Sequence, residues 1–278
     1  MPADRIVIFD VDGTLTATTG VDDHCLTSAW SRVFAIREAD IDTDWTTYAH
    51  STDEGLTLEV SQRHRGRAPT REEVGEVQRA FFALLRERIA DDPSRCIPVP
   101  GVHDLLAALA ADGWRIGLAS GAWEQSARIK LESAGVHAAH LPGTFSHTKT
   151  NPDTRGGTGS LPASAVATAI PATREDIIQS TLTKLFSSQS SSSSSSSPPS
   201  RPLYIGDGPW DARAARNLNL GFIGIRVDNH HARLHAEGAR TIFQDYTDLH
   251  AVLTALTRAE PPHAVACRTG HWALGTGH

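Results

Sequence analysis

Two aspartates, one residue apart, follow a short apolar segment near the start of the sequence. Residues 5–9 (RIVIF) are mostly β-branched and apolar, and D-V-D-G-T, which starts at Asp10, comes directly after them. Side chains two positions apart on a strand point to the same side, so the carboxylates of Asp10 and Asp12 are expected to lie together. Neighbouring carboxylates repel each other unless a cation or a shared proton intervenes, and a hard ion such as Mg²⁺ prefers oxygen ligands. The alternative is an ordinary turn, since Asp and Gly both favour turns.

A second pair of aspartates follows another apolar segment, residues 202–205. The sequence G-D-G-P-W-D places Asp207 and Asp211 four positions apart, and Pro209 suits the first turn of a helix. We expect Asp207 to share the cation of Asp10, with Asp211 directed to the same place from the start of the helix. The alternative is that these residues only cap that helix.

A third polar position, Ser120, lies between an apolar segment and a helical pattern, in the sequence A-S-G. A hydroxyl and the free backbone N–H groups at a helix N-terminus form a site for phosphate. Ser120 and Gly121 are therefore candidate phosphate ligands, and a helix cap is the alternative.

Apolar segments that alternate with helical patterns form the framework expected to position these residues. Strands are expected at residues 5–9, 114–119, 202–205 and 222–227. Helices are expected at residues 102–109, 123–134 and 173–186, the last with Thr173 as its N-cap. This alternation predicts an α/β fold, with a doubly wound, mostly parallel, Rossmann-like sheet covered by helices on both faces.

Residues 21–92 break the alternation, because they contain no convincing strand and at least two helical patterns, the clearer one at residues 71–90. We expect a small helical domain there and a core built from residues 1–20 and 93–258.

Three further segments are expected to be disordered, because they cannot bury enough apolar area to offset the entropy lost on ordering. They are residues 150–172, residues 187–200 with an unbroken serine run at 190–197, and the tail at 259–278. Cys267 and His271 have ligand-like spacing but lie in this tail, where no metal is expected.

The composition is that of an ordinary soluble protein. A formal charge of −6 gives no general attraction to nucleic acid or acidic membranes, so neither is expected as a partner. No apolar run approaches the roughly 20 residues that span a bilayer. Three scattered cysteines do not form a disulfide framework, and the D-V-D-G-T motif begins too early to leave room for a targeting segment, so the cytoplasm is the expected location.

The three motifs, in this order, resemble the haloacid dehalogenase superfamily over residues 5 to about 249. The resemblance implies that Asp10 is a nucleophile that becomes an aspartyl phosphate. It implies that Asp12 is the general acid for the leaving group and then the base for water. Ser120 and the Gly121 N–H would hold the phosphoryl oxygens.

The resemblance also implies a Mg²⁺ site formed by Asp10, the backbone carbonyl of Asp12 and Asp207, with Asp211 supporting it. Family members that cleave carbon–halogen bonds lack the second aspartate, so the presence of Asp12 favours phosphoryl transfer. The helical segment at 21–92 resembles the first type of cap in this family, which closes over the site and selects the substrate.

The family places a Lys, less often an Arg, before the helix that precedes the G-D motif, and two residues compete for this role. Lys149 begins K-T-N-P-D, but no convincing helix follows it. Arg174 opens the predicted helix directly and is the preferred candidate, because its planar guanidinium can hold an aspartate and a phosphate oxygen together.

The leading hypothesis is a Mg²⁺-dependent phosphatase acting on a small-molecule phosphate monoester. A phosphomutase with the same intermediate, a non-catalytic phosphate-binding or interaction protein, and a serine hydrolase built on Ser120 are the alternatives. Asp22, Asp23 and His24, or residues 45–55, are candidates for polar contacts with the substrate, but a solvated helix end is the preferred interpretation of these residues.

Overall fold

A six-stranded sheet in the order β10-β9-β8-β1-β4-β5 forms the centre of the molecule. The computed structural model describes residues 5–149, 170–187, 200–226 and 231–263. The strands are β1 (Ile6–Phe9), β4 (Arg115–Ala119), β5 (Gly143–Thr144), β8 (Leu203–Gly206), β9 (Gly221–Ile225) and β10 (Ile242–Phe243). All neighbouring strands in this sheet are parallel, so their carboxyl ends meet at one edge, where open α/β sheets bind ligands.

Strand β1 lies between two apolar cores, which explains its continuous apolar sequence. Val7 and Phe9 belong to a core shared with α4 (Val102–Ala111), α5 (Glu124–Ser133) and α9 (Leu249–Leu256). Ile6 and Ile8 belong to a second core on the other face. That second core is shared with α6 (Arg174–Ser187), α7 (Pro209–Asn217) and α8 (Ala232–Ala236). The predicted fold class, a mostly parallel sheet with helices on both faces, is confirmed.

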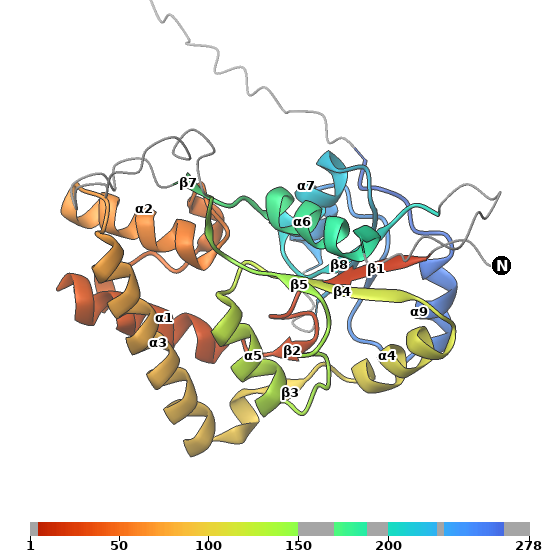
Figure 1. The fold of residues 1–278 in the computed structure, drawn as a ribbon, viewed down its shortest axis with the longest axis horizontal. Coiled ribbons are helices and arrows are strands. Elements are labelled where there is room, and N and C mark those ends of the chain that lie inside the picture. Colours follow the sequence, from red (N-terminus) through yellow and green to blue (C-terminus); the bar gives the residue numbers. More distant parts are fainter. Residues whose placement is uncertain (1–4, 150–169, 188–199, 227–230, 264–278) are drawn as a thin grey trace, which may run out of the picture.

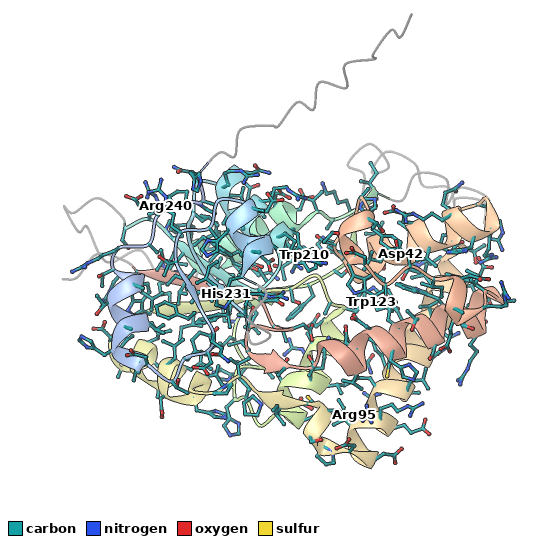
Figure 2. The ribbon with its side chains drawn as sticks, turned by 180° about the vertical axis from the view of Figure 1, so that it is seen from behind. Asp42, Arg95, Trp123, Trp210, His231 and Arg240 are labelled. Carbon is teal, nitrogen blue, oxygen red and sulfur yellow. The ribbon has the colours of Figure 1, made fainter. Side chains whose placement is uncertain are left out.

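Three helices, α1 (Thr19–Phe34), α2 (Asp53–Arg65) and α3 (Arg71–Asp91), gather at one end of the molecule, away from α4 and α9 (Figure 1). We call them the helical group. The fully buried indole of Trp30 on α1 joins two of its helices by donating a hydrogen bond to the Thr57 hydroxyl on α2, at 3.0 Å. Thr70 and Glu73 form a capping box that fixes the start of α3. Trp123 and Trp210 lie between the helical group and the sheet (Figure 2).

Short strands and single-turn helices complete the connections. Strands β2 (Thr16–Ala17) and β3 (Ile97–Pro98) pair antiparallel, as do β6 (Thr148–Lys149) and β7 (Ile170–Pro171). The single turns of 3₁₀ helix are Glu38–Asp40, Trp45–Thr47 and Pro93–Arg95. The β2–β3 pair ties the chain that enters the helical group to the chain that leaves it.

The boundaries predicted for the disordered segments are partly wrong. Residues 170–172 are ordered, because β7 pairs with β6 and Ala172 is buried. Ser187 is the last residue of α6. At the C-terminal side, residues 259–263 pack on the core, where the carbonyl of Glu260 accepts a hydrogen bond from the backbone N–H of Phe222 at 3.1 Å. The serine run, Cys267 and His271 lie outside the described residues.

Candidate active site

Asp10 directly follows β1 and is held where three central strands end. Its backbone N–H donates to the carbonyl of Ile205 on β8 at 2.9 Å, and only 3% of the residue is exposed. The chain then turns through Gly13, whose φ of +72° is a conformation that side chains rarely adopt. A Cβ at Gly13 would lie 2.2 Å from Oδ2 of Asp207, so the glycine allows the second aspartate motif to approach the first.

Arg174 begins α6 and points to Asp10. Its Nη1 donates to Oδ1 of Asp10 at 3.2 Å, and its Nε lies 3.3 Å from Oδ1 of Asp211. The guanidinium is 6% exposed, so it links the two aspartate motifs inside the protein. Lys149, the competing candidate, instead pairs with Asp176 at 2.5 Å and is 41% exposed. The structure therefore brings Arg174, and not Lys149, to the nucleophile candidate.

The predicted N-cap of α6, Thr173, is confirmed. The backbone N–H of Asp176 donates to the Thr173 hydroxyl at 3.2 Å, and the backbone N–H of Thr173 donates to the Asp176 carboxylate at 2.8 Å. This reciprocal pair fixes the first turn of α6 and thereby the position of the guanidinium.

Asp211 is fully buried and both of its carboxylate oxygens are engaged. Oδ2 accepts from the backbone N–H of Gly208 at 3.0 Å, and Oδ1 lies 3.0 Å from the hydroxyl of Tyr204. Asp207 is contacted by Arg226, whose Nη1 donates to its backbone carbonyl at 3.2 Å and lies 3.5 Å from its carboxylate. Asp211 thus both caps α7 and faces the site, so the two interpretations of its motif are compatible.

Carboxylate oxygens of Asp10, Asp207 and Asp211 lie within 4.8 Å of one another and could hold a metal ion. Burial raises the pKa of Asp10 to about 7, against the lowering effect of Arg174 and with further increases from Asp211 and Asp12. The pKa of Asp207 is raised well above its usual range by burial, then by the charges of Asp211 and Asp10. Buried carboxylates with this excess of negative charge fit a hard divalent cation with oxygen ligands.

Ser120 and Gly121 follow β4 and lie against the same cavity as Asp10. Ser120 is 1% exposed, and its hydroxyl accepts from the backbone N–H of Ala122 at 3.2 Å. A Cβ at Gly121 would lie 2.4 Å from the carbonyl oxygen of Ser51 and 2.9 Å from Nη2 of Arg174. Only glycine therefore lets this loop pass between the chain just before α2 and the guanidinium.

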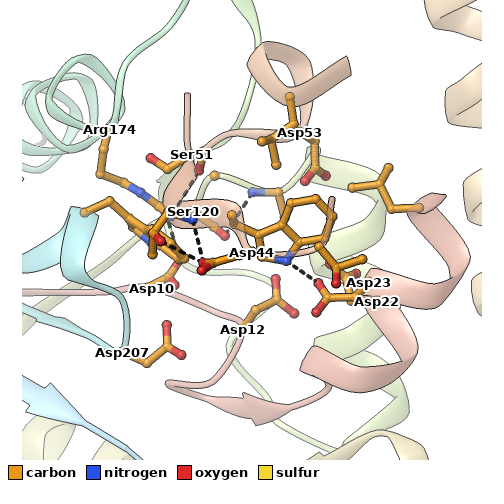
Figure 3. Close-up of a pocket in the computed structure, with 18 of the residues that line it drawn as sticks. Asp10, Asp12, Asp22, Asp23, Asp44, Ser51, Asp53, Ser120, Arg174 and Asp207 are labelled. Carbon is orange, nitrogen blue, oxygen red and sulfur yellow. Dashed lines mark hydrogen bonds and ion pairs between the residues drawn. The ribbon is translucent and has the colours of Figure 1, made fainter. Parts of the chain in front are cut away.

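The cavity has a volume of about 440 Å³ and lies between the sheet edge and the helical group (Figure 3). Asp10, Asp12 and Asp207 line one side, and Asp22, Asp23 and Asp53 line the other. The interpretation of Asp22 and Asp23 as a solvated helix end is wrong, whereas it holds for the exposed His24. From the predicted segment 45–55, Trp45, Thr46, Ser51 and Asp53 line the cavity.

Asp12 has two partners. Its Oδ1 accepts from the Thr18 hydroxyl at 2.6 Å, and its Oδ2 lies 2.6 Å from Nζ of Lys130 on α5. Lys130 is fully buried and also donates to Oδ1 of Asp22 at 2.7 Å. Burial would lower the pKa of Lys130, but the negative charges of Asp12, Asp22 and Asp53 outweigh this effect and raise it.

Lys130 and Arg226 are site residues that the sequence patterns did not single out, and Asp53 was included only as part of the predicted segment 45–55. A signal for Lys130 existed, because it lies three positions after Ala127 and next to Leu131, on the apolar face of its helix. Arg226 follows β9 at the strand edge where ligands bind. Asp53 has no such signal, since its place depends on a hydrogen bond from the backbone N–H of Trp123, at 2.8 Å and 70 positions away.

The fold and the site define a Rossmann-like α/β core with aspartates at the carboxyl ends of its strands. A family model described as haloacid dehalogenase-like hydrolase matches residues 5–219. The chain therefore belongs to the haloacid dehalogenase-like hydrolase family, which confirms the resemblance and the prediction of a hydrolase.

Solved structures share the fold over nearly the whole chain. A hydrolase from Pseudomonas syringae is 20% identical with a TM-score of 0.57, covering 91% of this chain and 98% of that one. CbbY from Rhodobacter sphaeroides in complex with phosphate is 19% identical with a TM-score of 0.58, covering 88% and 95%. A predicted phosphoglycolate phosphatase from Haemophilus somnus is 17% identical with a TM-score of 0.54, covering 91% and 99%.

Comparison with curated proteins gives no match. None of the described helices has the length and apolar character that a membrane span requires.

Proposed function

We propose that this protein is a Mg²⁺-dependent phosphatase that hydrolyses a small-molecule phosphate monoester through an aspartyl phosphate on Asp10. The observation that carries the proposal is the meeting of Asp10, Asp207, Ser120 and Arg174 around one cavity. In this cavity, the buried carboxylate of Asp10 contacts the guanidinium of Arg174, which can also reach a phosphate oxygen.

In the first step, a carboxylate oxygen of Asp10 attacks the phosphorus atom and the bond to the leaving oxygen breaks. Asp12, in its protonated form, gives its proton to that oxygen, so the product leaves as a neutral alcohol. The Ser120 hydroxyl and the N–H of Gly121 orient the phosphoryl oxygens, and Arg174 offsets their charge.

In the second step, Asp12 acts as the base and takes a proton from a water molecule. The resulting hydroxide attacks the phosphorus of the aspartyl phosphate, and the bond to Asp10 breaks. Inorganic phosphate leaves, Asp10 is again a carboxylate, and Asp12 again holds a proton. Splitting one slow hydrolysis into two displacements is the advantage of covalent catalysis.

Asp10, Asp207 and the backbone carbonyl of Asp12 would hold Mg²⁺, and Asp211 would support them, because its own oxygens already accept hydrogen bonds. Bound Mg²⁺ supplies charge stabilisation of the transferring phosphoryl group. We assign residues 21–92, which contain all of the helical group except the first two residues of α1, as a cap whose acidic side chains face the alcohol part of the substrate.

The neighbouring structures support a phosphate ester as the substrate. CbbY is described in complex with phosphate and, as a mutant, with xylulose-(1,5)bisphosphate. In this chain, no histidine is among the described residues that line the cavity, which disfavours the serine hydrolase alternative.

The test is phosphate release from a generic aryl phosphate, with and without Mg²⁺, by the wild type and by Asp10→Asn. Release that requires Mg²⁺ and is lost in the variant is the expected result. Unchanged release in Asp10→Asn would reject the assignment of the nucleophile. Transfer of the phosphoryl group to a sugar in place of water would identify a phosphomutase. Binding of Mg²⁺ and ester without turnover would identify a non-catalytic binding protein.

A further inference from the structure

Lys130 is a fully buried cation to which the proposed reaction gives no role. It projects from α5, and its side chain is 0% exposed. Its Nζ lies 2.6 Å from Asp12 in the turn after β1 and 2.7 Å from Asp22 on α1. One ammonium group therefore joins the core helix, the first aspartate motif and the helical group.

The two contacts on Asp12 restrict the orientation of its carboxyl group. Thr18 donates to Oδ1 and Lys130 donates to Oδ2, each at 2.6 Å. A carboxyl group with a donor on each oxygen cannot rotate about its terminal bond without losing a charge-assisted hydrogen bond, which is among the stronger kinds. Asp22 contributes by holding the ammonium group from the opposite side.

Stability alone is a poor explanation for this lysine. A buried ion pair contributes little compared with apolar side chains of the same volume, because both charges lose their hydration. The single positive charge of Lys130 also cannot neutralise all of the carboxylates that act on it, which are Asp12, Asp22 and Asp53.

We propose that Lys130 is a positioning residue, which holds the Asp12 carboxyl group in the orientation for proton exchange with the leaving oxygen. This inference rests on the proposed function. Lys130 keeps its own protons throughout. The proton that Asp12 gives to the leaving oxygen is restored from the attacking water, so the balance of the two steps is unchanged.

The test is the dependence of kcat/KM on the leaving group in Lys130→Met. A series of substituted phenyl phosphates, from 4-nitrophenyl to 4-methoxyphenyl, varies how much protonation the leaving oxygen needs while its size stays similar. The value of kcat/KM depends only on the steps up to and including the first irreversible one, so it is not affected by the later hydrolysis of the aspartyl phosphate. We expect Lys130→Met to lose at least about tenfold more activity on the 4-methoxyphenyl ester than on the 4-nitrophenyl ester, as loss of a well-placed general acid predicts.

Arg128→Met is the matched control, because Arg128 lies on the same helix and its guanidinium pairs with Glu124, away from Asp12. This variant should change kcat/KM by the same factor for both esters. If Lys130→Met does not fold, the double variant Lys130→Met with Asp22→Asn takes its place. Loss of Lys130 leaves the carboxylates of Asp12 and Asp22 without their cation, and the second substitution removes one of these two charges.

Equal loss on all esters, or no loss, would overturn the positioning role, because a purely structural lysine does not change the leaving-group dependence. These outcomes differ from failure of the proposed function. In that case the wild type would release no phosphate from any ester, or Asp10→Asn would remain active.

Discussion

Asp23 on α1 provides a test of the electrostatics of the cavity wall. Burial, followed by the negative charge of Asp22, raises its pKa from 3.8 to about 7. A hydrogen bond from Nε1 of Trp45 to Oδ1, at 2.9 Å, only partly opposes this rise. Asp23→Asn removes the ionisable group and keeps an oxygen that can accept from Trp45.

The sign of the effect follows from proton linkage. Between pH 4 and 7 the folded protein keeps a proton on Asp23 that the unfolded chain has released, so rising pH destabilises the wild type. A shift of about 3 pH units corresponds to about 4 kcal/mol when fully expressed. The free energy of unfolding of Asp23→Asn, relative to the wild type, should therefore increase by up to about 4 kcal/mol from pH 4 to pH 8.

Urea unfolding of both proteins at several pH values measures this difference. Asp42→Asn is the control of opposite sign, since hydrogen bonds from the Thr47 hydroxyl and the backbone N–H of Asp44 lower the pKa of Asp42. Asp42→Asn should lose stability relative to the wild type at neutral pH and recover it as the pH falls. Parallel pH curves for the wild type and Asp23→Asn would refute the reasoning.

Three further changes test the geometry around Asp10. Gly13→Ala should destabilise the fold by at least about 1 kcal/mol in thermal unfolding, because the site has positive φ and its Cβ would meet Asp207 at 2.2 Å. Arg174→Lys should reduce phosphate release by about tenfold or more, because a point charge cannot contact Asp10 and Asp211 together as the fork does; full activity would contradict this role. Asp207→Asn should weaken Mg²⁺ binding in calorimetry at least about tenfold, through loss of an anionic oxygen ligand; unchanged affinity would exclude Asp207 as a ligand.

The sequence predicts the motif residues well because their position follows from local rules. Asp10, Ser120 and Asp207 each follow an apolar strand, and parallel strands bring their carboxyl ends to one edge. Arg174 is favoured over Lys149 by the same kind of reasoning, since a helix start fixes one residue in space.

The opposite wall of the cavity could be predicted only as candidate segments, because no local rule places its individual side chains. Asp53 is placed by contacts with residues about seventy positions away, and the sequence contains no periodic pattern that encodes them. The buried Lys130 follows from a tertiary cluster of carboxylates that overrides the usual preference of lysine for the surface. The ends of the segments expected to be disordered were misplaced, because pairing of β6 with β7 orders residues that lack a strong local preference.

The most direct test of the central claim is detection of the aspartyl phosphate itself. The protein is mixed with Mg²⁺ and a reactive aryl phosphate, quenched in acid within the first turnover, digested and examined by mass spectrometry. We predict that the peptide containing Asp10 gains the mass of one phosphoryl group, and that Asp10→Asn gains none. Phosphate release with no modified peptide, or with the phosphoryl group on Ser120, would contradict the account.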